Sequence, residues 1–252
     1  MGTGTSQGVP VIACDCEVCQ SSDPRDNRLR TSLHLQIDDV SIGIDCGPDF
    51  RQQMLRAKVS HLDAILITHE HNDHIIGMDD VRPFNFRSRK DMLVYATESV
   101  QGQLIHRFPY VFATENRYPG APMIKLLDLH KDQPFEIAGI KIIPIEVMHG
   151  KLPVLGFRFG NFAYITDMKT ISDEEFAKLE GVTHLVVNAL HHNEHFTHMN
   201  LTEALAFTER VGAKKTYFTH ISHRMGLYEE VEKTLPEGVM LAYDGLRETI
   251  SM

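Results

Sequence analysis

The sequence predicts an α/β layered domain, and three patterns carry this prediction. Strand pairs joined by short turns come first, strands alternate with helices afterwards, and this order runs twice, once before about residue 110 and once after about residue 134. The predicted strand pairs cover residues 33–37 with 41–45, 135–137 with 141–145, and 155–159 with 162–166. Gly160 and Asn161 separate the last pair and suit a two-residue turn.

Further elements are predicted between these hairpins. Apolar runs at residues 64–68 and 185–188 indicate buried strands, and residues 216–219 are a weaker candidate. The predicted helices cover residues 98–108, 172–179, 201–211 and 227–235. Ser172 followed by Glu175 predicts a capping box, and Asn200 is a predicted N-cap. Residues 113–132 contain two prolines and a glycine close together and are expected to form a connecting loop.

Length and composition favour one large domain over residues 1–252. Hydrophobic residues make up 42% of the chain and charged residues 23%, as in soluble globular proteins. No apolar run approaches the roughly 18 residues that span a bilayer, and residues 1–6 lack the features of a signal peptide, so we expect no membrane partner and a cytoplasmic location. A net charge of −9 makes a nucleic-acid partner disfavoured, although a local basic patch such as residues 82–90 remains open.

The strongest chemical signal is the motif His69-x-His71-x-Asp73-His74, directly after the predicted strand at residues 64–68. Residues two apart on an extended loop point the same way, so His69 and His71 can share one metal ion. Asp73 and His74 then turn the other way and can serve a second ion. Imidazole nitrogens and carboxylate oxygens together suit zinc, manganese or iron.

Four ligands cannot complete two metal sites, so further ligands are expected downstream. His149, Asp167 and His220 each lie just beyond the end of a predicted strand. Loops at strand ends hold functional groups on a rigid scaffold. Each of these residues alone could be an ordinary surface polar residue, but as a set they complete the first motif.

The cysteines form a separate signal. Cys14, Cys16 and Cys19 are crowded into six positions, whereas Cys46 stands alone. In a reducing compartment such a cluster indicates a metal site more than disulfides. The spacing of Cys14 and Cys16 is tighter than the usual spacing of zinc ligands, so a reduced surface cluster is the alternative.

In its motif order the chain resembles the metallo-β-lactamase-fold hydrolase superfamily over essentially its whole length. The resemblance implies a four-layer αββα sandwich with the metal ions at one edge, and Asp45 as a strand-end carboxylate that supports the metal loop. It implies two catalytic metal ions, zinc or manganese. The implied ligands are His69, His71 and His149 for one ion, Asp73, His74 and His220 for the other, and Asp167 as a bridge.

The opening residues 2–10, the cysteine cluster, residues 30–32 and residues 45–51 are similar to one branch of this superfamily. That branch includes the PhnP-type phosphodiesterases, which open cyclic ribose phosphates. The similarity implies a structural zinc, and it implies that His198 acts close to the catalytic metals. The implied ligands of that zinc are Cys14, Cys16, Cys19 and His223.

The expected function is therefore a metal-dependent phosphodiesterase acting on small or cyclic phosphodiesters. Two metal ions lower the pKa of bound water from about 15.7 toward about 7. His198 is the candidate proton donor or phosphoryl stabiliser, with capping of the next helix as its alternative, and Asp73 and His198 are the catalytic candidates. His191, His192 and His195 receive no role.

Other functions stay open. An RNase Z-like nuclease would use similar ligands but needs a long basic arm that the sequence lacks. A thioester or lactone hydrolase would fit the same metals, and a non-catalytic metal-binding module would need a filled coordination shell. The oligomeric state is open, a homodimer included.

Overall fold

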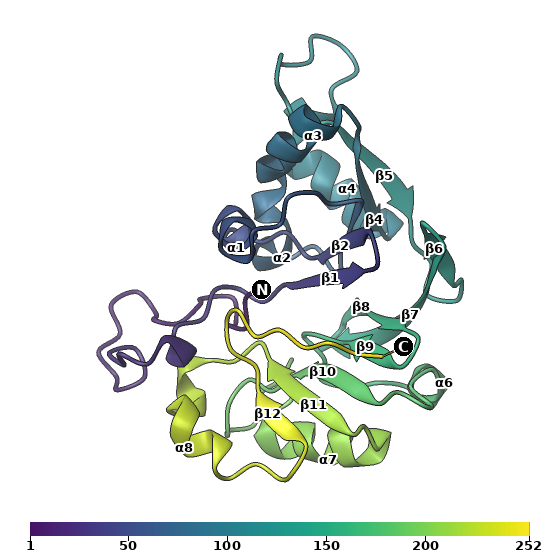
Figure 1. Cartoon of the computed structure of the whole chain (residues 1–252). Coiled ribbons are helices and arrows are strands. Elements are labelled where there is room, and N and C mark those ends of the chain that lie inside the picture. Colours follow the sequence, from purple (N-terminus) through teal and green to yellow (C-terminus); the bar gives the residue numbers. More distant parts are fainter. Residues whose placement is uncertain (252) are drawn as a thin grey trace. The chain divides into compact units, whose positions relative to one another are not determined.

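The computed structural model describes residues 1–251 and contains two mixed β-sheets (Figure 1). The chain divides into two compact units. The first consists of Met1 and residues 32–130, and the second of residues 2–31 and residues 131 onward. This division does not decide whether the chain is one domain, which stays a prediction.

The sheet of the first unit has the order β1-β2-β3-β4-β5. β1 and β2 form an antiparallel hairpin, and β2 to β5 are parallel. The carboxyl ends of these four parallel strands therefore meet at one edge of the sheet. The strands are β1 (Leu33–Ile37), β2 (Val40–Ile44), β3 (Ala64–Leu66), β4 (Met92–Ala96) and β5 (Ile124–Asp128).

Helices of the first unit supply much of its core. Phe50 of α1 and Leu104 of α4 are fully buried and belong to one apolar cluster with Ile65 and Val94 of the sheet. Thr97 caps α4 by accepting a hydrogen bond from the Val100 N–H. The helices are α1 (Phe50–Ala57), α2 (Asn72–Ile75), α3 (Arg82–Ser88), α4 (Glu98–Arg107) and α5 (Pro109–Phe112), with a 3₁₀ helix η2 (Ile76–Val81).

The sheet of the second unit has the order β12-β11-β10-β9-β8-β7-β6. β9 to β12 are parallel, and β8 is antiparallel to both β7 and β9. β7 therefore runs in the same direction as β9 to β12, so their carboxyl ends share one edge. The strands are β6 (Phe135–Ile137), β7 (Ile140–His149), β8 (Leu152–Phe159), β9 (Phe162–Tyr164), β10 (His184–Asn188), β11 (Lys215–Thr219) and β12 (Val239–Leu241).

The main helix of the second unit is α7 (Leu201–Val211). Asn200 and Glu203 form a full capping box at its start, and Gly212, with a φ of 70°, ends it in the left-handed conformation. Ala204 of α7 packs in one apolar cluster with Val187 of β10. The other helical segments are η1 (Pro24–Asp26), α6 (Asp173–Ala177), η3 (His223–Met225) and α8 (Tyr228–Glu232).

All three predicted hairpins are confirmed, as is the two-fold run of the pattern. The four predicted helices are confirmed too: α7 has the predicted bounds, and the other three are shorter by one to four residues. Residues 113–132 are not only a loop, because they contain β5, whose Ile124 and Leu126 pack against the core. The capping box at Ser172 forms only in part. Ser172 accepts from the Glu175 N–H, but the Glu175 carboxylate accepts from the Glu146 N–H at 2.7 Å instead of closing the box.

None of the helices within residues 1–251 has the length and apolar character of a bilayer-spanning segment.

Candidate metal centres

The metal loop of the first unit follows β3. His69 and His74 are fully buried on it. The Nε2 of His69 lies 3.0 Å from the Nδ1 of His71, and the Nε2 of His74 lies 3.2 Å from the Oδ2 of Asp73. Ligand atoms that share one ion at about 2.0–2.2 Å lie about 3–3.5 Å apart, so both pairs have the spacing of shared ligands. The loop thus groups its ligands in the two pairs expected from the sequence, and their metal assignment stays a prediction.

Asp45 supports this loop from the end of β2. Its Oδ1 accepts from the Thr68 N–H at 2.9 Å, and its Oδ2 lies 2.6 Å from the Nδ1 of His74. Burial raises the pKa of Asp45, and the contact with His74 opposes that rise. A carboxylate only accepts, so the Nδ1 of His74 must donate, which leaves its Nε2 as the ligand atom. Arg107 of α4 also contacts the loop, because it donates to the Glu70 carbonyl.

A second cluster lies at the sheet edge of the second unit. His149 is the last residue of β7, Asp167 follows β9, and His220 follows β11. The Oδ1 of Asp167 lies 3.1 Å from the Nε2 of His220 and 3.1 Å from the Nε2 of His198. The ligand atoms of His149, Asp167 and His198 all lie within 4.8 Å of one another. The donor set and its spacing fit a divalent metal ion.

Backbone geometry at two of the candidate ligands and at Asp45 is unusual. Asp45, Asp167 and His220 have φ values of 65°, 59° and 55°, in the left-handed region that costs non-glycine residues free energy. Such outliers gather at functional sites, where the surrounding structure holds them in place. The sequence contains no signal for them.

Asn188 is a supporting residue that sequence reasoning missed. Its Oδ1 accepts from the Met168 N–H at 2.7 Å, and its Nδ2 donates to the Met168 carbonyl at 2.9 Å. These two bonds fix the turn that carries Asp167. A polar residue ending an apolar strand was the available signal, since Asn188 is fully buried at the end of β10.

His149 is oriented by the loop between β10 and α7. Its Nδ1 lies 3.0 Å from the Thr197 carbonyl oxygen, which can only accept. The Nδ1 of His149 must therefore donate, and its Nε2 is left for a metal ion.

His198 lies inside this second cluster. Its ring stacks on that of His220 with centroids 4.8 Å apart, and its edge meets the ring of His149 at 4.4 Å. The alternative that His198 caps α7 is wrong, because Asn200 is the N-cap. Burial lowers the pKa of His198 to about 4, with the hydrogen bond to Asp167 acting in the opposite direction. The metal-free protein therefore holds His198 neutral at neutral pH.

The cysteine cluster is a third group, also within the second unit. The Nδ1 of His223 lies 3.3 Å from the Sγ of Cys14, 3.3 Å from that of Cys16 and 3.6 Å from that of Cys19. A tetrahedral zinc ion with bonds of about 2.3 Å to sulfur and about 2.0–2.1 Å to nitrogen separates these atoms by about 3.5 Å, so the four residues fit zinc. A hydrogen bond from the Cys19 N–H, together with His223, lowers the pKa of Cys16 to about 6, whereas burial raises the pKa of Cys19 to about 11.

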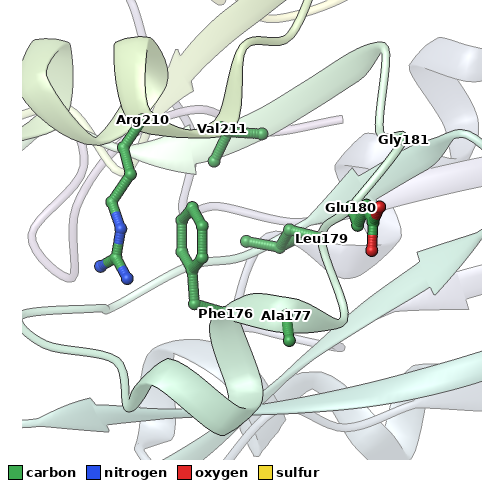
Figure 2. Close-up of a pocket in the computed structure, with 7 residues that line it drawn as sticks. All are labelled: Phe176, Ala177, Leu179, Glu180, Gly181, Arg210 and Val211. Carbon is green, nitrogen blue, oxygen red and sulfur yellow. The ribbon is translucent and has the colours of Figure 1, made fainter.

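A pocket of about 360 Å³ lies between α6 and the end of α7 (Figure 2). Phe176, Leu179 and Val211 form its apolar wall. The guanidinium of Arg210 lies 3.7 Å from the centre of the Phe176 ring and pairs with Asp173 at 2.7 Å. No candidate ligand lines this pocket, so it is not the site of the expected chemistry.

Histidines and carboxylates gathered at the carboxyl ends of strands define a metal-binding α/β protein. The chain belongs to the β-lactamase superfamily, because the family model described as "Beta-lactamase superfamily domain" matches residues 41–221. Its fold is the metallo-β-lactamase fold, as the resemblance implied.

Similar proteins refine this placement. A solved structure described as a new diphosphatase from the PhnP family is 43% identical, with a TM-score of 0.91, and the match covers 97% of this chain and 93% of that one. A protein of Porphyromonas gingivalis named octanoyltransferase is 42% identical over 99% of this chain and 51% of its own length. A ribonuclease Z of Ignicoccus hospitalis is 24% identical over 54% of this chain and 45% of its own length. The chain spans about half the length of these curated relatives.

Proposed function

We propose that this chain is a metal-dependent phosphodiesterase that acts on small or cyclic phosphodiesters. The observation that carries the proposal is the buried cluster in which the Oδ1 of Asp167 lies 3.1 Å from both the His198 and the His220 Nε2 atoms. Support also comes from the similarity to a diphosphatase of the PhnP family. Diphosphate and phosphodiester hydrolysis both displace an oxygen from phosphorus, so the two reactions need the same stabilisation of charge.

The proposed cofactors are two divalent ions, zinc or manganese, and one structural zinc. When bound, the catalytic ions would supply a nucleophilic hydroxide and neutralise charge on the phosphoryl oxygens. The ligand assignment follows the family resemblance. It gives His69, His71 and His149 to one ion, Asp73, His74 and His220 to the other, Asp167 to both, and Cys14, Cys16, Cys19 and His223 to the structural zinc.

The chain's own residues would orient the histidine ligands and supply a proton to the leaving oxygen. Asp45 and the Thr197 carbonyl fix the rings of His74 and His149 by holding their Nδ1 protons. His198 uses its Nε2 to hold a phosphoryl oxygen or to protonate the leaving oxygen. Burial disfavours the charged form of His198. His198 therefore takes up the proton that it donates only when the negative charge of a bound substrate lies beside it.

An acyl thioester hydrolase is the second candidate, and the relative named octanoyltransferase is the observation that favours it. About half of that protein has no counterpart in this chain, so the acyl activity in its name is not assigned to the matched half. The nuclease alternative has weaker support, because the ribonuclease Z match covers about half of this chain and the net charge is −9.

A substrate panel with the metal-loaded protein tests the proposal. The panel contains bis(p-nitrophenyl) phosphate, a 2′,3′-cyclic nucleotide, a dinucleotide joined through a diphosphate, and an octanoyl thioester. We expect turnover of the phosphorus substrates, and loss of that turnover in Asp167→Asn. Turnover of the thioester alone would overturn the phosphodiesterase and support the acyl hydrolase. Turnover of the diphosphate alone would move the substrate class to diphosphates.

A further inference from the structure

An exposed phenylalanine lies on the loop between β10 and α7. Phe196 is 77% exposed, although it is a direct chain neighbour of Thr197 and only two residues from His198. Burying a phenyl side chain normally stabilises a fold, and this ring forgoes most of that gain. Single exposed apolar residues are common on protein surfaces, so exposure alone assigns no function. The position of Phe196 beside the candidate metal cluster is the feature that needs an explanation.

The residues that follow Phe196 are tied to that cluster. The Thr197 carbonyl lies 3.0 Å from the Nδ1 of His149, and the Nε2 of His198 lies 3.1 Å from the Oδ1 of Asp167. Two residues of chain reach at most about 7 Å, so the backbone of Phe196 lies within that distance of the backbone of His198. All of these residues belong to the second unit.

Gly150, directly after His149, lets the loop approach the turn that follows β7. It has a φ of 64°, which side-chain-bearing residues rarely adopt, and a Cβ there would lie only 3.0 Å from the Thr197 methyl group. The same Cβ position is 3.6 Å from Cε1 and 3.8 Å from Cδ1 of the Phe196 ring. One edge of the phenyl ring therefore meets the turn. A ring packed flat against the protein would lose much more of its surface, so Phe196 keeps an open face beside the cluster.

An open phenyl face suits a flat group and offers no hydrogen bond. Stacking of a base on an aromatic side chain accepts any base, because every base has a π-face. In a nucleotide one ribose separates the base from the phosphate. A phosphate held at the cluster would therefore bring the base to the loop that carries Phe196. The competing occupants of this face are an apolar acyl chain and a second copy of the chain.

We propose that Phe196 is a specificity-determining residue that stacks on the base of a nucleotide substrate. The phosphate of that substrate lies at the cluster of His149, Asp167 and His220. This inference rests on the proposed phosphodiesterase activity and narrows its substrate class to phosphodiesters that contain a nucleoside, with little preference among the bases. Cyclic phosphates without a base are then poorer substrates.

Kinetics on substrates with and without a base test the stack. Phe196→Ala should raise KM for a 2′,3′-cyclic nucleotide about 5–100-fold, the usual contribution of one stacked base, and leave kcat nearly unchanged. KM for glycerol 1,2-cyclic phosphate, a cyclic diester without a base, should stay the same. Phe196→Tyr should keep the wild-type values. Phe86→Ala is the matched control, because Phe86 is 56% exposed on α3, and it should change neither substrate. Equal rises on both substrates in Phe196→Ala would overturn the proposal.

A binding test does not depend on activity. The chain contains no tryptophan, so Phe196→Trp has a single indole at this position, and a base stacked on it quenches its fluorescence. In the zinc-loaded variant, adenosine monophosphate should quench the emission until the site is saturated, whereas ribose 5-phosphate should not. Phe86→Trp should respond to neither compound. Saturable quenching in a protein that cleaves no phosphodiester would uphold the stack and overturn the proposed function instead.

The same variant separates the competing occupants. A response to octanoate without a response to adenosine monophosphate would overturn the proposal in favour of an acyl group. An emission that changes only when the protein is diluted would overturn it in favour of a contact between two copies of the chain. Quenching by ribose 5-phosphate as strong as that by adenosine monophosphate would show that no base stacks there, which also overturns it.

Discussion

Two clusters within the second unit are built in opposite ways. Cys14, Cys16 and Cys19 come from one short loop, His223 comes from η3, and all four are only half-buried. The cluster around Asp167 is buried, and its members come from different strand ends and from the loop before α7. Three of the four groups of the first cluster are neighbours in the sequence, and only His223 is brought in by the fold, whereas every member of the second cluster is brought in by the fold.

The difference indicates what each cluster is for. Three thiolates and one imidazole complete a tetrahedron and leave no position for water, which is typical of a structural metal site. In the second cluster two imidazoles approach one carboxylate oxygen, and one of them, His198, continues into a row of hydrogen bonds. The proposed function gives that arrangement a part in proton movement as well as in metal binding. Substitutions in the two clusters should therefore affect different properties.

The largest effect is expected from Asp167→Asn. The carboxylate contacts both His198 and His220, so its loss should remove catalytic metal and lower activity by several orders of magnitude. Metal content by elemental analysis, together with kcat, measures this. Exhaustive chelation of the wild type should act in the same way and be reversed by added zinc or manganese. Full activity after chelation would contradict the whole assignment.

His198→Ala is expected to rank next. General acid–base help typically contributes about 10²–10⁴-fold, so kcat should fall by that amount while both catalytic metals remain bound. His106→Ala, at an exposed position of α4, is the control and should change neither. Loss of a metal ion in His198→Ala would show that His198 is a ligand, which its place beside His149 and Asp167 also allows.

Cys16→Ser should mainly change stability. We expect the loss of one zinc ion and a fall in melting temperature of about 10 °C, equivalent to about 3 kcal/mol for a chain of this size. Activity should fall less than in His198→Ala, because His223 is only three residues from His220 and loosening one disturbs the other. Unchanged zinc content and melting would show that the cysteines are only a reduced surface cluster.

Asn200→Ala should have the smallest effect. Loss of an N-cap typically costs about 0.5–2 kcal/mol, so the melting temperature should fall by a few degrees with little change in kcat. Ser172→Ala, which removes the N-cap of α6, is the matched control. A larger fall in kcat for Asn200→Ala than for Ser172→Ala would show that the α7 cap also positions His198, two residues before it.

The sequence predicted the parts of the site that follow from strand ends and local spacing. Strands β7, β9 and β11 could be placed from hydrophobic patterns, and the ligand-type residues after them followed directly. β5 was missed because Pro119, Gly120 and Pro122 dominate the segment before it, and the burial that stabilises the strand comes from tertiary packing.

The supporting residues could not be predicted. Asn188 holds the Met168 backbone through contacts that form only when β10 and the turn after β9 come together. Glu175 is a residue for which the local sequence predicts a contact that a tertiary contact replaces. Its spacing from Ser172 predicts a local capping bond, yet its carboxylate binds the more distant Glu146 N–H.

At Asp45, Asp167 and His220 the left-handed backbone lowers the stability of the fold, whereas the side chain serves the proposed activity. Glycine would relieve a backbone cost of about 1–2 kcal/mol at each position, but it would remove a carboxylate or an imidazole from the site. Selection for stability alone would therefore favour glycine at these positions. A lineage that kept the fold but no longer used the reaction should lose its site there first, and should become more heat-resistant as it does so.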